Sequence, residues 1–183
     1  MRSFATKGIR AVKMDDIARE LTMSKRTLYE LFENKEAVLY EGVRRHHEEG
    51  KLRMDELVNK SDNVMSVILS TYRLKLNELR QVNPDFYADI SRYPAVMEYL
   101  EQRNRESQHS FLSFLHRGVD EGYFRREVNY DLIVHVFNAI GRYTTDNNLY
   151  SRYSMEELIN NMFISTLRGF CTSRGLEVLD REL

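Results

Sequence analysis

Apolar residues recur every three or four positions along most of this chain, which is the spacing that one buried face of an α-helix requires. The pattern predicts about nine helices. They are expected at residues 2–6, 14–21, 24–32, 35–59, 63–82, 86–92 and 94–121, with two final helices capped at 129 and 154. In the fifth of these, Leu76 and Leu79 are expected to face inward.

Composition supports an all-α fold. The 183 residues include only eight glycines and two prolines, which disfavours disorder and turn-rich β folds. A single cysteine, Cys171, cannot form an intrachain disulfide and is typical of a reducing compartment. No stretch approaches the roughly 20 apolar residues that span a bilayer, and the first ten residues lack the apolar core of a signal peptide. A cytoplasmic protein with no membrane partner is expected.

The charge is uneven along the chain. The net charge is −1, yet residues 1–35 carry eight basic and five acidic side chains. A mildly basic N-terminal head on an acidic body favours phosphate contacts at the head.

Residues 14–36 have the pattern of two short helices separated by a tight turn at Thr22-Met23. Small Ala18 allows the helices to cross closely, and Ser24 can cap the second helix. The face buried by the pair is expected to consist of Ile17, Leu21, Met23, Leu28 and Phe32. The face left outward on the second helix carries Lys25, Arg26, Thr27, Tyr29 and Glu30. This is helix-turn-helix geometry, in which the second helix enters the major groove of DNA.

These residues resemble the N-terminal domain of the TetR (tetracycline-repressor-like) family of bacterial transcriptional regulators. The matching landmarks are Phe4, Gly8, Ile17-Ala18, and the run from Ser24 through Lys35-Glu36. The resemblance implies a DNA-binding domain at residues 1–50 and a helical effector-binding and dimerisation domain at residues 51–183. It further implies a homodimeric repressor that binds a pseudo-palindromic operator, responds to a small-molecule effector and is not an enzyme.

The resemblance also assigns DNA-binding roles to individual residues. Lys25, Arg26 and Thr27 would probe the groove, Tyr29 would reach a phosphate, and Lys35 would hold another. Ser24 would cap the recognition helix. The DNA-binding residues implied are Lys13, Ser24, Lys25, Arg26, Thr27, Tyr29 and Lys35.

Three positions depart from the family pattern. The first helix is about a dozen residues shorter than usual. Lys13 replaces the Ser or Thr before the second helix, which removes a cap but leaves a cation near a phosphate. Thr22 occupies the turn position usually given to Gly, which predicts altered dihedral angles or strain at a β-branched residue.

Aromatic and polar residues of the middle helices predict an effector pocket that is mainly apolar with a few converging polar groups. The expected lining residues are Tyr72, Phe86, Tyr93, Met97, Asn104, Ser107, His109 and Phe111.

The last two predicted helices carry broad apolar faces together with small Ala139, Gly141 and Gly169. Two copies would form an intermolecular four-helix bundle. The expected interface residues are Val136, Phe137, Ile140, Tyr143, Ile159, Met162, Phe163, Thr166 and Phe170.

Two other functions remain open from the residues alone. Glu106 and His109 have the Glu-x-x-His spacing of helical di-iron proteins, but a second copy on another long helix is lacking. A helical interaction scaffold without DNA binding is the other alternative. No phosphate loop, catalytic triad or cofactor motif is found, so neither a metal nor a cofactor is expected.

Overall fold

Polar side chains at the predicted capping positions set where most helices begin. In the computed structural model, which describes the backbone of residues 1–183 and every side chain except that of Leu79, a side-chain oxygen accepts a backbone N–H at the start of seven helices. The capping residues are Ser24, Asn34, Asn63, Asn83, Asn129, Ser154 and Thr172. The predicted inward position of Leu79 lies outside the described side chains.

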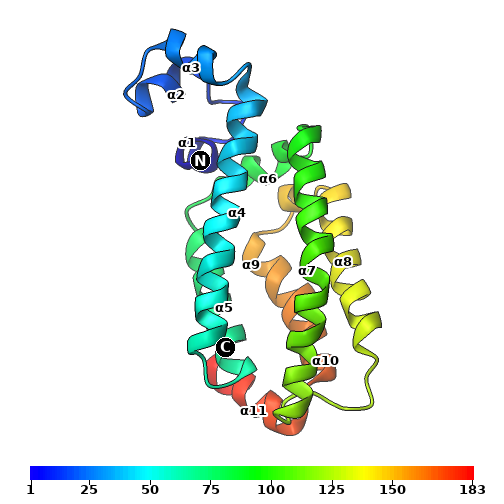
Figure 1. Ribbon diagram of the computed structural model, residues 1–183. Coiled ribbons are helices and arrows are strands. Elements are labelled where there is room, and N and C mark those ends of the chain that lie inside the picture. The colour runs from blue at the N-terminus through cyan, green and yellow to red at the C-terminus, as the bar shows by residue number, and fades with distance from the viewer.

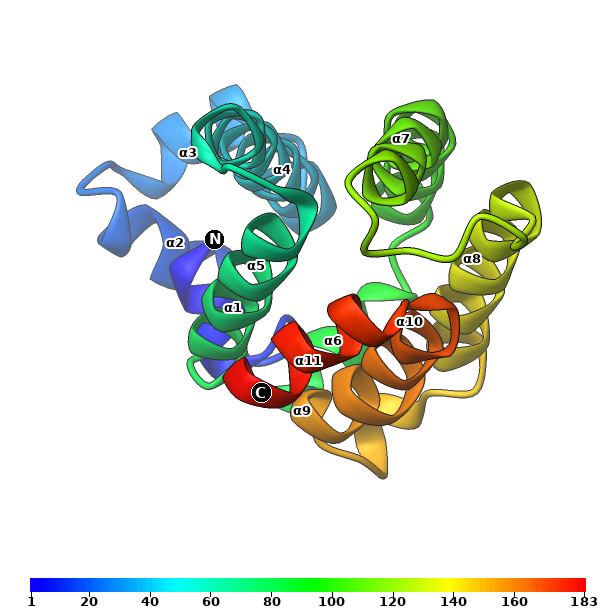
Figure 2. The same ribbon diagram turned by 90° about the horizontal axis from the view of Figure 1, so that it is seen from below.

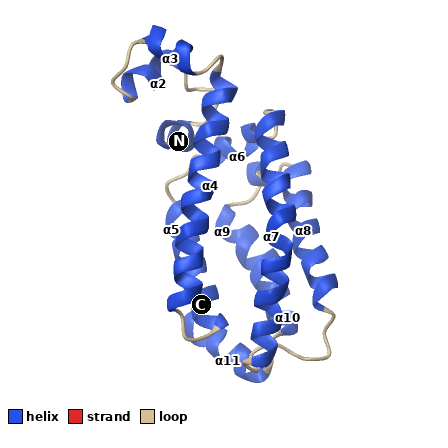
Figure 3. Ribbon diagram, viewed as in Figure 1, coloured by secondary structure: helices blue, strands red, loops and turns tan.

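Every regular element of the described backbone is helical, which confirms the all-α fold (Figure 3). The helices are α1 (Arg2–Lys7), α2 (Met14–Glu20), α3 (Lys25–Leu31), α4 (Lys35–Lys60), α5 (Val64–Leu79), α6 (Pro84–Ile90), α7 (Pro94–Asp120), α8 (Tyr130–Asp146), α9 (Met155–Leu158), α10 (Ser165–Phe170) and α11 (Ser173–Glu182). A 3-10 turn covers Leu149–Ser151, and a π-helical segment over Ile159–Ile164 joins α9 to α10.

The molecule is elongated, with α1, α2 and α3 forming a small head at one end (Figure 1). The 26-residue helix α4 leaves the head and runs beside α5 along the body, over roughly 39 Å at 1.5 Å per residue. Viewed from below, the α4–α5 pair lies opposite α7 and α8, and α9, α10 and α11 close the side between them (Figure 2). Helix α4 continues without a break through residue 50, where the two predicted domains meet.

Two clusters of buried apolar side chains hold this arrangement together. The head core joins the head to α4, α6 and the start of α7, and consists of Phe4, Ile9, Val12, Met14, Ile17, Ala18, Leu28, Leu39, Val43, Phe86, Val96 and Tyr99. The body core lies among α5, α7, α8, α10 and α11, and consists of Val64, Met65, Leu69, Leu115, Tyr123, Phe124, Tyr130, Val134, Leu167, Phe170, Cys171 and Leu179.

Three sequence-based expectations need correction. If α9, the π-helical segment and α10 are counted as the one helix expected there, the described chain has ten helices rather than nine, because α11 follows the helix that ends at Phe170. Its Gly175 lies so close to the Tyr123 carbonyl oxygen that an added Cβ would be 2.5 Å away. The last predicted helix is interrupted by the π-helical segment. Leu21, expected to be buried, is 50% exposed because it is the C-cap residue that follows α2 at the turn.

The predicted strain at Thr22 is confirmed. Thr22 has φ 55°, in the left-handed region that a β-branched residue rarely adopts. The turn it makes is closed by the Met23 N–H, which donates to the Ala18 carbonyl at 3.0 Å. The helix-turn-helix geometry is therefore retained without glycine.

Within the described residues, no helix is both long enough and apolar enough to cross a membrane.

Candidate nucleic-acid interface

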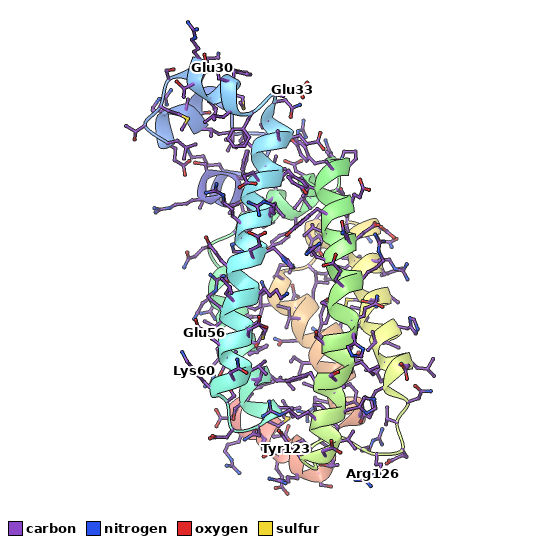
Figure 4. The ribbon with its side chains drawn as sticks, viewed as in Figure 1. Glu30, Glu33, Glu56, Lys60, Tyr123 and Arg126 are labelled. Carbon is purple, nitrogen blue, oxygen red and sulfur yellow. The ribbon has the colours of Figure 1, made fainter. Side chains whose placement is uncertain are left out.

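Helices α2 and α3 pack against each other through a small set of buried side chains. Ile17 and Ala18 of α2 and Leu28 of α3 are all at most 6% exposed. Their burial leaves the opposite face of α3 to solvent at the outer end of the molecule, where Figure 4 labels Glu30 and Glu33. The structure thus places the second helix of the motif outward, as the major-groove interpretation requires.

The start of α3 is fixed by Ser24. Its hydroxyl oxygen accepts the Thr27 backbone N–H at 3.1 Å and shares a 2.8 Å hydrogen bond with the Thr27 hydroxyl. This cap is the one the sequence predicts. Ser24, Lys25, Arg26, Thr27 and Tyr29 are all exposed, with Tyr29 at 47%.

The predicted cations of the interface already have partners in the free chain. The Lys25 ammonium lies 2.7 Å from Asp15 Oδ1, and this hydrogen bond and charge raise the pKa of Lys25. Arg26 pairs with Glu30 at 2.9 Å along the same helix. Both pairs are exposed to solvent, so a phosphate can replace the carboxylate at little cost.

Lys35 has a different environment. Its ammonium donates to the backbone carbonyls of Ile9 at 3.1 Å and Val12 at 3.2 Å, so that α4 is tied to the loop between α1 and α2. Two of the three ammonium donors are therefore used inside the head. The phosphate contact predicted for Lys35 has one donor left.

Lys13 precedes α2 in extended conformation, as expected from its position. Its backbone N–H donates to Asp16 Oδ2 at 3.0 Å, but an ammonium cannot accept a hydrogen bond from the helix amides. The Lys13 side chain is exposed, and its ammonium takes no part in capping α2.

These residues surround one hollow on the head. It has a volume of about 580 Å³, and four cations and two carboxylates line it. The lining residues are Arg10, Val12, Lys13, Met14, Asp15, Lys25, Tyr29, Glu33, Asn34 and Lys35. Four of the seven predicted DNA-binding residues, from three segments of the chain, thus lie around a single concave surface with a positive balance of charge.

The expected effector-pocket residues fall into three separate places. Phe86 lies in the head core, and Tyr93 packs against it. The Tyr72 hydroxyl donates to Asn160 Oδ1 at 2.8 Å in the body, while Phe111 makes an edge contact with Phe137 at 5.5 Å. The residues exposed on α7 are Asn104, Ser107 and His109, and Met97 is half-buried near the start of the same helix.

The expected dimer-interface residues divide into exposed and packed groups. Val136 and Tyr143 of α8 are 42% and 58% exposed. Phe137 packs within the chain against Phe163 at 5.9 Å and against Phe170, which is only 2% exposed. The residues that remain half-buried are Ile140, Ile159, Met162 and Thr166.

Two residues near these sites were not anticipated. Arg10 lines the hollow on the head, and Asn160 faces Tyr72 from the π-helical segment. The excess of basic residues in positions 1–35 could have pointed to Arg10 as a further cation of the interface. The direction of Asn160 could not be predicted from a period of 3.6 residues per turn, because Asn160 lies in the π-helical segment.

Glu106, the proposed metal ligand, accepts hydrogen bonds from Arg103 at 2.7 Å and Gln102 at 3.0 Å. Among the side chains that the structure describes, no group of three or more His, Cys, Asp or Glu residues could hold a metal ion. The di-iron alternative has no support from this geometry.

Comparison with known proteins agrees with the helix-turn-helix geometry. Residues 1–41 match the family described as bacterial regulatory proteins, tetR family. The HTH-type transcriptional repressor KstR2 of Mycobacterium tuberculosis (strain CDC 1551 / Oshkosh) is 25% identical over 135 residues, which cover 71% of this chain and 68% of that protein.

Solved structures share the fold along nearly the whole chain. E. coli NemR in its reduced form has a TM-score of 0.68 at 16% identity, covering 93% of this chain and 91% of that one. A regulator from Saccharomonospora viridis in complex with choline has a TM-score of 0.68 at 17% identity, covering 93% of both chains. The matched segment identifies residues 1–41 as similar to the N-terminal domain of the tetR family of bacterial regulatory proteins, and the solved structures show a common fold along nearly the whole chain.

Proposed function

We propose that this regulator is a homodimeric repressor that binds a pseudo-palindromic DNA operator through α3 and releases or retains it in response to a small effector bound in the body. The observation that carries the proposal is the outward face of α3, on which Lys25, Arg26, Thr27 and Tyr29 are exposed beside a hollow lined by four cations. Long cationic side chains there contact phosphates and base edges, and the capped start of the helix fixes their register.

Dimerisation is supported by an unpartnered face on α8. Leu132 and Val136 are one turn apart, Tyr143 lies two turns further along, and the three are 61%, 42% and 58% exposed. An added Cβ at Gly141 or Gly169 would have no atom within 4 Å in the single chain, so a second backbone has room to approach. Apolar exposure with adjacent small residues is typical of a helix-bundle interface.

An effector role for the body is supported by the part-buried polar pair of Tyr72 and Asn160, which joins α5 to the π-helical segment. A fold neighbour holds choline, which is a property of that protein. Helix α4 would carry the response, because it reaches from the head to the far end of the body. A ligand that prefers one tilt of α4 changes the spacing of the two heads and hence operator affinity.

DNA recognition is tested by selection from a random duplex library followed by gel-shift titration. The selected sequence is expected to contain two-fold symmetric half-sites about one duplex turn, ~34 Å, apart. Lys25→Ala and Arg26→Ala should each weaken binding of that duplex. Lys60→Ala is the matched control, because Lys60 is an exposed cation at the opposite end of α4 (Figure 4). Unchanged affinity in both α3 variants contradicts the assignment of α3.

The oligomeric state is tested separately by light scattering after size-exclusion chromatography. Val136→Glu places a charge on the proposed interface and should shift the protein from dimer to monomer. Leu52→Glu is the control, since Leu52 is 65% exposed on α4, away from α8. A monomeric native protein, or a Val136→Glu variant that stays dimeric, contradicts the proposed interface.

A further inference from the structure

Arg10 is an exposed cation in the loop between α1 and α2, and its side chain lines the same hollow as Lys13, Lys25 and Lys35. Two lysines of this group have partners: Lys25 is paired with Asp15 at 2.7 Å, and Lys35 donates to two backbone carbonyls. Among the side chains that the structure describes, no ion pair involves Arg10 or Lys13. Arg10 in the loop and Lys13 before α2 are therefore the cations of the hollow that can take a phosphate without giving up an ion pair in the described chain.

The Arg10 backbone is held from the body. Its N–H donates to Asp89 Oδ2 of α6 at 3.1 Å, and Asp89 is only 6% exposed. A buried carboxylate that accepts a backbone N–H makes a charge-assisted hydrogen bond, which is stronger and more directional than a neutral one. The other oxygen of Asp89 lies 3.9 Å from Arg92 Nε, which is an ion-pair distance but too long for a hydrogen bond.

Two further contacts hold α1 and the first residue of this loop against the start of α6. The Asn83 N–H donates to the Ala5 carbonyl at 2.7 Å. Gly8 has φ 82°, and a Cβ added there would be 3.2 Å from the Asp85 Cβ. The end of α1 and the first part of the loop that carries Arg10 are thus held against α6.

We propose that Arg10 is a DNA-phosphate contact of the head and that Asp89 of α6 is the residue that positions it. This inference rests on the proposed DNA-binding function and names a contact outside the helix-turn-helix. An arginine suits the role because its guanidinium matches the geometry of two phosphate oxygens.

The hydrogen bond between Arg10 and Asp89 is a second connection, besides α4, between the body and the proposed DNA interface. Helix α6 also contacts the 3-10 turn that follows α8, through Tyr87 and Tyr150, whose ring centroids are 5.1 Å apart. A displacement of α6 by the body therefore moves the Arg10 loop directly, through the Asp89 hydrogen bond.

The test measures how binding to DNA depends on salt. The probe is a labelled mixed-sequence duplex of about 30 base pairs, and fluorescence anisotropy is recorded in potassium chloride from roughly 50 to 200 mM, where each phosphate contact contributes about 0.9 to the slope of log K against log salt. Arg10→Ala should reduce the slope by about 0.9 for each head that engages. The affinity of this variant then falls about 3.5-fold less over that salt range, per head, than that of the native protein. Arg10→Lys should retain the slope, as should Arg152→Ala, a control that removes an exposed arginine of the body.

Asp89→Ala tests the positioning role, and Asp89→Asn is the second variant because it keeps the size and one acceptor oxygen. Asp89→Ala should lower the slope only while Arg10 is present, so that the double variant equals Arg10→Ala alone. Circular dichroism confirms that each variant is folded. If Asp89→Ala does not fold, Asp89→Asn replaces it in the test. Asp89→Asn should lower the salt slope by a smaller amount, and again only while Arg10 is present.

The outcomes separate the two proposals. Native protein that shows no salt-dependent binding overturns the proposed DNA-binding function, and this inference with it. Native protein with a steep slope that Arg10→Ala leaves unchanged overturns only the role of Arg10. A loss from the Asp89 variants that adds fully to that of Arg10→Ala overturns the positioning role of Asp89.

Discussion

Replacing Thr22 with glycine should stabilise the head. Thr22 holds φ 55° at the turn between α2 and α3, where an L-residue with a Cβ pays about 1–2 kcal/mol relative to its preferred conformations. Glycine removes that conflict but loses about 0.5–1 kcal/mol through the greater freedom of its unfolded chain. The net gain in free energy of unfolding is about 0.5–1 kcal/mol.

The side chain of Thr22 is exposed, so its removal costs no packing. The turn is held by backbone hydrogen bonds, from Thr22 N–H to Arg19 and from Met23 N–H to Ala18, and both remain in the variant. For a chain of this size the gain corresponds to a rise in Tm of about 1–4 °C.

The assay is urea unfolding followed by circular dichroism at one fixed protein concentration. Thr22→Gly should raise the midpoint with no change in the slope m. Thr22→Ala is the control, since it removes the branch but keeps the Cβ that opposes positive φ. A lower midpoint for Thr22→Gly, or an equal gain in Thr22→Ala, would refute the assignment of strain to this turn.

Three further predictions follow from packing and titration. Gly118→Ala should lower the free energy of unfolding by about 2–3 kcal/mol in a thermal melt, because its Cβ would lie 2.1 Å from the Phe124 ring, whereas Gly42→Ala should be near neutral since only a flexible methionine side chain faces it. Hydrogen bonds from two arginines lower the pKa of Glu41 to about 2, so this carboxylate stabilises the fold at pH values above its unfolded pKa near 4.5. Acid titration should show that this stability is lost between about pH 4.5 and 2 in the native protein but not in Glu41→Gln. Burial raises the pKa of the Cys171 thiol to about 11, so iodoacetamide at pH 8 should label it only after denaturation, and rapid labelling of folded protein would contradict its burial.

The head was largely predictable from the sequence because its signals are local. Ser24 caps α3 and Leu28 is buried, as their positions in a short amphipathic helix require. For Thr22 the sequence left two outcomes open, altered dihedral angles or strain, and the positive φ corresponds to the second.

The electrostatics of the head were not predictable in the same way. Lys25 meets Asp15 across the turn, and Lys35 reaches carbonyls 23 and 26 residues earlier in the chain. Long flexible side chains choose partners that depend on how helices cross, which a helical period does not encode.

The body shows a second limit. The spacing of apolar residues around α6 and α7 indicates that Phe86 and Tyr93 face inward. It does not indicate that these two side chains pack in the head core rather than in the body. Helix α11 was missed although Thr172 is a suitable cap and Leu176 and Leu179 are three residues apart, and its Gly175 is what lets the Tyr123 carbonyl approach.

The head core contains residues from both of the domains that the sequence predicts, 1–50 and 51–183. The first three helices pack against Phe86, Val96 and Tyr99. Cutting the chain near residue 50 would therefore expose apolar surface on both fragments. Exchange of the DNA-reading segment between related regulators, to build a chimera with new sequence specificity, therefore has to transplant α6 and the first turns of α7 along with it.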